Sequence, residues 1–170
     1  MLDIIYNRRS TKKYIDKEVK KDLIDKVIKA GMHAPTGRNL QSPIILCVRN
    51  KEVRDQLAKA NAEVMGVTSD PFYGAPVVLV VLAKKDVSTH VYDGSVVMEN
   101  MMLAAECLGL GSCWIHRARE VFESPLGKDV LNSLGIKDEY EGIGNLILGY
   151  KADYQVKEKV LKDNWVYYID

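Results

Sequence analysis

The chain has 170 residues, a length that suits one domain with a substantial core, so we expect a single domain over residues 1–170. Its 24 basic residues nearly balance 23 acidic ones, which excludes a global field that attracts nucleic acid or an anionic membrane. Any cationic cluster must therefore act locally. No apolar run reaches membrane-spanning length and the N-terminus lacks the order of a secretory signal, so we expect a cytoplasmic protein without a membrane partner.

The first predicted element is a short helix over residues 2–7, and the basic stretch NRRSTKKY follows at 7–14. If this stretch is extended, Arg8, Ser10 and Lys12 share one face, because side chains two apart point the same way. A guanidinium fork, a hydroxyl and an ammonium on one face form a candidate cradle for an anion. The alternative is a solvated charged surface, which is typical of such clusters.

Helix and strand patterns alternate through the rest of the chain. Apolar residues at helical spacing predict an amphipathic helix over residues 16–33. Further helices are predicted over the polar stretch 51–61, over 93–108, which is apolar almost all round, and over 125–136. Short apolar runs predict strands over residues 43–49, 76–84, 109–115 and 141–151. The run at 76–84 is expected to be buried on both faces, and the helix at 93–108 to be buried deeply or against another subunit. This order predicts an α+β fold.

The loop HAPTGRNLQSP, residues 33–43, is expected to join the first long helix to the first strand. Its prolines and glycine suit an ordinary turn. Its backbone groups and the Asn39 carboxamide also suit the edge of a planar heterocycle, and both interpretations stay open. The later GLGS at 109–112 lacks a third glycine and follows a helix, so it is not a dinucleotide-binding motif.

The C-terminus combines cations with aromatic residues. Lys157, Lys159 and Lys162 are by themselves a solvated run. The final NWVYYI, residues 164–169, is β-prone and aromatic, so it must pair either within the chain or on a neighbour.

The cysteines and histidines give no sign of metal or disulfide chemistry. Cys47, Cys107 and Cys113 are odd in number and lie in apolar stretches, so we expect small core residues in a reducing compartment. The three histidines have no metal-ligand spacing, and no Ser or Cys lies in the context of an activated nucleophile. We therefore expect neither a metal site nor covalent catalysis by the protein itself.

Five segments occur in the order typical of the flavin-dependent nitroreductase family, which the chain resembles over essentially its whole length. They are RRSTKKY, APTGRNLQSP, APVVLVV, DGSVVMENMMLAAECLGLGSCWI and GNLILGYK. The resemblance implies a central, mostly antiparallel sheet flanked by helices, and an obligate homodimer that exchanges C-terminal strands and binds FMN at its interface. It also implies ping-pong transfer from NADH or NADPH to FMN and then to a nitroaromatic, quinone or enone.

The resemblance further implies which residues bind FMN. They are Arg8, Arg9, Ser10, Lys12, Pro35, Thr36, Gly37, Asn39, Trp114, Ile115, His116 and Lys159. Lys12 is implied at the pyrimidine edge of the flavin, where it is also the expected catalytic residue because it stabilises the reduced flavin. The residues from Pro35 to Asn39 are implied to reach the flavin of the partner subunit.

The chain departs from the family pattern in two places. His116 and Arg117 stand where relatives commonly carry a small or acidic residue, which affects the substrate pocket. Leu161 stands where relatives carry the arginine of a Lys-x-Arg pair, so Lys162 or Lys157 is the alternative phosphate ligand beside Lys159. Alternative functions are a flavin-binding or phosphate-backbone-binding module without turnover, and a dehalogenase or flavin-fragmenting enzyme on the same scaffold.

Overall fold

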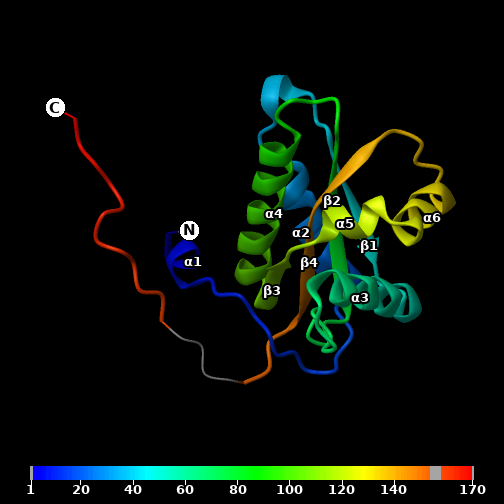
Figure 1. Cartoon of the computed structure of the whole chain (residues 1–170). Helices are drawn as coiled ribbons and strands as arrows, with labels where there is room; N and C mark the ends of the chain where they lie inside the picture. Colours follow the sequence, from blue (N-terminus) through cyan, green and yellow to red (C-terminus); the bar gives the residue numbers. More distant parts are fainter. Residues whose placement is uncertain (1, 154–157, 170) are drawn as a thin grey trace.

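The computed structural model describes residues 2–153 and 158–169 (Figure 1). The helices are α1 (Leu2–Asn7), α2 (Lys21–Met32), the 3-10 turn η1 (Gly37–Asn39), α3 (Lys51–Met65), α4 (His90–Cys107), α5 (Ala118–Glu123) and α6 (Pro125–Ser133). The strands are β1 (Pro43–Val48), β2 (Val77–Lys84), β3 (Leu110–Ile115) and β4 (Tyr140–Tyr150). They form one antiparallel sheet in the order β1-β2-β4-β3, which confirms the expected α+β fold.

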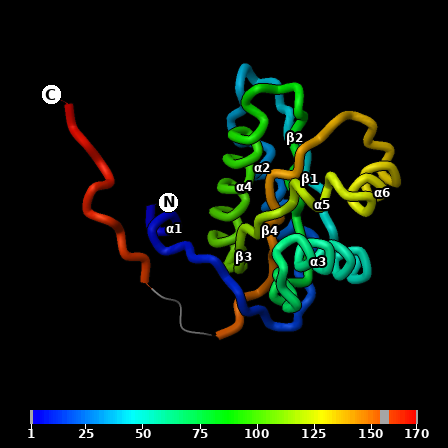
Figure 2. The backbone as a smooth tube through the Cα atoms, in the orientation of Figure 1, coloured from blue at the N-terminus to red at the C-terminus, as the bar shows by residue number. Residues whose placement is uncertain are grey.

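The centre of the sheet is the pair β2 and β4, which runs from Val77 opposite Leu148 to Lys84 opposite Tyr140 with a shift of register between Val81 and Leu82. Odd-numbered residues of β2 face a core with α2 and α4, and even-numbered residues face a second core with α3, α5 and α6. Figures 1 and 2 show these helices on opposite faces of the sheet. β2 is therefore buried on both faces, as its continuous apolar run predicts.

Helix α4 packs closely on the sheet through one face and leaves another face open. A Cβ added at Gly94 would lie 2.5 Å from Cγ1 of Ile143 on β4, so only glycine permits this approach. On the open face, apolar side chains are exposed to solvent. They are Val91, Tyr92 and Val96.

The N-terminal segment covers the outer edge of β3. The Thr11 amide donates to the Ser112 carbonyl over 2.9 Å, and the Ile15 amide donates to the Tyr150 carbonyl over 3.1 Å. Thr11 is buried against Gly111, where an added Cβ would lie 2.6 Å from the Thr11 methyl group. Main-chain bonds and close packing thus fix the basic stretch at this edge.

The opposite edge of the sheet, along β1, pairs with no other strand in the described part of the chain. Residues 158–169 form no strand and extend away from the sheet (Figures 1 and 2). Pairing of 164–169 within the chain is therefore wrong, because this aromatic segment lies exposed. Its pairing with a neighbouring subunit stays a prediction.

Two further expectations are corrected. Cys47 and Cys107 are exposed and only Cys113 is buried, because Cys47 lies on the edge strand β1 and Cys107 ends α4. The helix α5 was not expected, since its six residues are too few for a periodic pattern. Among the described helices, none is long and apolar enough to cross a membrane.

Candidate functional site

The first group of candidate residues lies on the segment that covers β3. The Nη1 atom of Arg8 is buried and has no hydrogen-bond partner among the described residues. A buried charged donor without an acceptor is costly, so this atom indicates an anionic oxygen as its missing partner. Arg9 differs, because its Nη1 donates to the carbonyls of Tyr6 and Arg8 at 2.6 and 2.9 Å. Arg8 and Arg9, which look equivalent in the sequence, thus differ in their hydrogen-bond partners.

The predicted alternation between exposed and buried side chains holds over residues 10–12. Ser10 and Lys12 are exposed, while Thr11 between them is buried. The Lys12 ammonium lies 5.6 Å from the centroid of the Tyr73 ring, within the range of a cation–π contact. Lys12 therefore presents its charge on the outer surface beside an aromatic ring.

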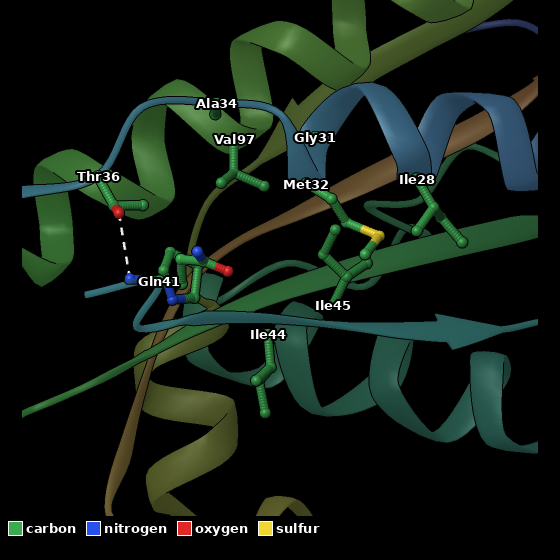
Figure 3. Close-up of a pocket in the computed structure, with 10 residues that line it drawn as sticks. Ile28, Gly31, Met32, Ala34, Thr36, Gln41, Ile44, Ile45 and Val97 are labelled. Atoms are coloured by element: carbon green, nitrogen blue, oxygen red, sulfur yellow. Dashed lines mark hydrogen bonds between the residues drawn. The ribbon is translucent and has the colours of Figure 1, made fainter. Parts of the chain in front are cut away.

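The second group lies on the turn between α2 and β1. The Gly37 amide donates to Oδ1 of Asp93 over 2.9 Å. The Gln41 amide donates to Oγ1 of Thr36 over 3.1 Å, as Figure 3 shows. Arg38, Asn39 and Gln41 all have positive φ, at 53°, 56° and 49°. Such values are uncommon outside glycine and cluster at functional sites.

A cavity of about 300 Å³ lies beside this turn. Its lining combines the polar residues Thr36 and Gln41 with apolar side chains from α2, β1 and α4 (Figure 3). The apolar residues include Ile28, Met32, Ile44, Ile45 and Val97. The cavity is therefore suited to an apolar group.

The third group is the turn from β3 to α5. Trp114 packs so closely on Gly144 that an added Cβ would lie 2.3 Å from the indole Nε1. Ile115 is buried and His116 is exposed. The Nδ2 atom of Asn61 donates to the His116 carbonyl over 3.0 Å, which fixes the backbone of the turn.

Two further interactions hold the same turn. Nδ2 of Asn145 lies 3.5 Å from the Ile115 carbonyl, and Arg117, at φ 78°, pairs with Glu120 over 2.8 Å. Burial acts to raise the pKa of Glu120, but hydrogen bonds from its own backbone and from Arg117 outweigh it and lower that pKa. Glu120 thus stays ionised as the partner of Arg117.

Sequence reasoning missed three buried polar residues that hold these turns, namely Asn61, Asp93 and Asn145. Their only signal was a polar side chain inside an apolar run, which cannot name a partner far away in the sequence. The C-terminal lysines are not brought to the sheet: Lys159 is exposed, and Lys162 lies 5.1 Å from the Trp165 ring. Lys157 lies outside the described residues.

The first two groups lie toward opposite ends of helix α4. The turn at 36–41 lies at the N-terminal end of α4, whereas the segment with Arg8 lies near its C-terminal end (Figures 1 and 2). The helix has 18 residues, which corresponds to about 27 Å. The Arg8 segment and the turn thus lie toward opposite ends of a long helix in the same chain.

Comparison with known proteins gives consistent matches. Residues 5–150 match the nitroreductase family. Over 159 residues the chain is 34% identical to an Archaeoglobus fulgidus protein named as an NADH dehydrogenase/NAD(P)H nitroreductase, covering 89% of this chain and 86% of that protein. A Methanothermobacter thermautotrophicus protein of the same name is 32% identical over 118 residues, covering 67% of this chain and 59% of that protein.

Solved structures match over nearly the whole chain. A nitroreductase with bound FMN from Bacteroides fragilis superposes with a TM-score of 0.90 at 28% identity, covering 99% of this chain and 98% of that chain. An FMN-dependent nitroreductase from Clostridium difficile has a TM-score of 0.82 at 28% identity, with the same coverage of 99% and 98%.

Proposed function

Because the chain belongs to the nitroreductase family, we propose that it is an FMN-dependent oxidoreductase that uses NADH or NADPH to reduce an electron-poor acceptor. The acceptor class is a nitroaromatic, a quinone or an enone. The buried Nη1 atom of Arg8, which has no hydrogen-bond partner in the described part of the chain, carries the proposal, because a flavin phosphate would supply an anionic oxygen. The relative that binds FMN supports it. Use of a nicotinamide also fits the expected cytoplasmic location.

When bound, FMN supplies the redox chemistry, accepting electrons from the nicotinamide and delivering them to the acceptor in ping-pong order. The chain then needs no nucleophile of its own. Arg8 and Ser10 hold the phosphate end, joined by Lys159 or Lys162 from the C-terminal segment. Arg9 holds the end of α1 through the Tyr6 carbonyl and binds the cofactor only indirectly.

Lys12 is the proposed catalytic residue. It lies at the pyrimidine edge of the flavin, where reduction places negative charge, and an ammonium there stabilises the reduced form more than the oxidised form. Trp114, Ile115 and His116 line the ring, since their turn is held rigidly by buried asparagines.

A homodimer completes the site. Pro35, Thr36, Gly37 and Asn39 contact the flavin of the partner, because α4 separates them from Arg8 in their own chain. The open face of α4 forms part of the interface. Residues 164–169 add to the unpaired edge of β1 on the partner, which gives this β-prone segment the neighbour that it lacks at home.

The function is tested by the absorption spectrum of the purified protein. We expect a flavin spectrum, directly or after incubation with FMN, that bleaches when NADH or NADPH is added without oxygen. Re-oxidation by a quinone completes the cycle. A flavin spectrum that neither nicotinamide bleaches would instead identify a binding module without turnover. Failure to bind FMN at all would contradict the proposal.

Arg8→Ala should weaken FMN binding by about 1.5–3 kcal/mol, or roughly ten- to a hundredfold, because one charge-assisted hydrogen bond is lost. Arg9→Ala is the matched control, since Arg9 already bonds to carbonyls of its own chain. Its effect should be clearly smaller. Titration of FMN fluorescence measures both dissociation constants. Equal effects of the two substitutions would remove Arg8 from the phosphate site.

Lys12→Met should lower the two-electron reduction potential of bound FMN and slow its reduction by up to about a hundredfold, because the reduced flavin loses a positive partner. Lys13→Met is the control, since Lys13 is an exposed neighbour of the same charge. Spectroelectrochemistry and stopped-flow reduction give the two quantities. An unchanged potential in Lys12→Met would remove Lys12 from the pyrimidine edge.

Deletion of residues 164–170 should convert the dimer to a monomer and release FMN. Sedimentation velocity followed at the flavin absorbance measures both the mass and the bound FMN.

The same deletion should expose Cys47 on β1 and make it react faster with a maleimide. The comparison is made at one pH, because partial burial raises the pKa of the Cys47 thiol and the reaction rate depends on its ionisation. Unreactive Cys113 reports an intact fold, since it is buried. A folded monomer that keeps stoichiometric FMN would show that one chain builds the whole site.

A further inference from the structure

Asp93 is a buried carboxylate in a helix whose other buried residues are nearly all apolar. Only 5% of its surface is exposed. Both oxygens are occupied: Oδ1 accepts from the Gly37 amide and Oδ2 accepts from the Thr89 hydroxyl, each over 2.9 Å. Because burial of a charge is costly unless it is paired or hydrogen-bonded, a carboxylate kept at this position indicates a specific task.

The location of Asp93 explains how the charge is tolerated. It lies in the first turn of α4, where free amide groups and the helix dipole favour a negative charge. Its own amide donates to the Thr89 carbonyl over 2.8 Å, which fixes the carboxylate relative to the helix. Asp93 is therefore a rigid acceptor at the end of the longest described helix.

The turn that it holds has little other support. Its remaining hydrogen bonds in the described chain are internal, from Asn39 to Thr36, from Leu40 to Gly37 and from Gln41 to Thr36 or Asn39. The Gly37–Asp93 bond thus links the turn to an element 56 residues away. Three non-glycine residues of the turn hold positive φ, a conformation that needs a constraint to persist.

Contact between Gly37 and Thr89 shows how closely the turn approaches α4. A Cβ added at Gly37 would lie 2.4 Å from the Thr89 Oγ1 atom. Any other side chain must therefore displace the turn or the Thr89 side chain, while the Asp93 carboxylate itself is retained.

We propose that Asp93 is a positioning residue for the flavin site, acting through the Gly37 amide to hold Pro35, Thr36 and Asn39 in the conformation that contacts the partner's FMN. The proposal rests on the proposed function for its ligand. It adds that FMN affinity at one subunit depends on a carboxylate that lies at the far end of α4 in the other subunit and touches no cofactor atom.

The test uses the full-length protein and three substitutions. Asp93→Ala removes both acceptor oxygens, Asp93→Asn retains one acceptor for the Gly37 amide, and Gly37→Ala displaces the turn with Asp93 intact. Asp22→Ala is the matched control, because Asp22 also lies in the first turn of a helix but is exposed and pairs with Lys26. If loss of a carboxylate from the first turn of a helix had a general effect on stability or FMN binding, Asp22→Ala would show the same effect.

Hydrogen exchange followed by NMR reads the turn without any cofactor. We expect the Gly37 amide to exchange at least about tenfold faster in Asp93→Ala, since its acceptor is lost, while amides within α4 keep their protection. FMN titration should show at least a tenfold higher dissociation constant for Asp93→Ala and for Gly37→Ala. Asp93→Asn should recover most of the affinity.

The outcomes separate this inference from the proposed function. If the wild-type protein binds no FMN, the proposed function fails, and the inference fails with it. If the wild type binds FMN and Arg8→Ala weakens binding, but Asp93→Ala and Gly37→Ala bind as tightly as Asp22→Ala, only the inference is overturned. Should Asp93→Ala fail to fold, Gly37→Ala decides, because it retains the Asp93 carboxylate and instead crowds the turn against Thr89.

Discussion

Burial of β2 and β4 on both faces is the constraint on which the rest of the structure depends. Two apolar strands at the centre of a sheet require helices above and below them, and the chain supplies α2 and α4 on one side and α3, α5 and α6 on the other. Only the two outer strands are then open to function. The N-terminal segment covers β3 with its basic residues, and β1 remains open to another chain.

The length of α4 supports the proposed homodimer. Different parts of the candidate site lie near the two ends of this helix. Near one end, Nη1 of Arg8 has no hydrogen-bond partner among the described residues, and near the other end lies a polar turn with positive φ angles. In the dimer that we propose, a two-fold axis would bring one end of α4 beside the opposite end of the partner's helix. The same dimer would cover the apolar residues that are exposed on α4 and at 165–169.

Much of this fold follows from periodicity in the sequence. The four strands and the long helices lie where apolar spacing predicts them, since burial on one or two faces leaves a local signature. The six residues of α5 leave none. The C-terminal segment has the composition of a strand, but a strand exists only with a neighbour to bond to, and the sequence does not say which neighbour is available. Likewise, Cys47 lies in an apolar run but on an edge strand, and only the order of strands reveals its exposure.

The sequence predicts candidate site residues, which remain a prediction, but it does not predict the buried residues that hold their backbone in place. Basic and amide-rich segments can be recognised from a few adjacent residues. The hydrogen bonds of Asn61 and Asp93, in contrast, join residues that are 55 and 56 positions apart in the sequence. These buried supports act on backbone atoms of Gly37 and His116, so they constrain the path of the chain and leave the outward side chains free to vary. A departure such as His116 therefore changes the side chain that projects from the turn, while the bond from Asn61 still holds the backbone. In the function that we propose, the held backbone would position the cofactor, and the projecting side chains would set which acceptor is used.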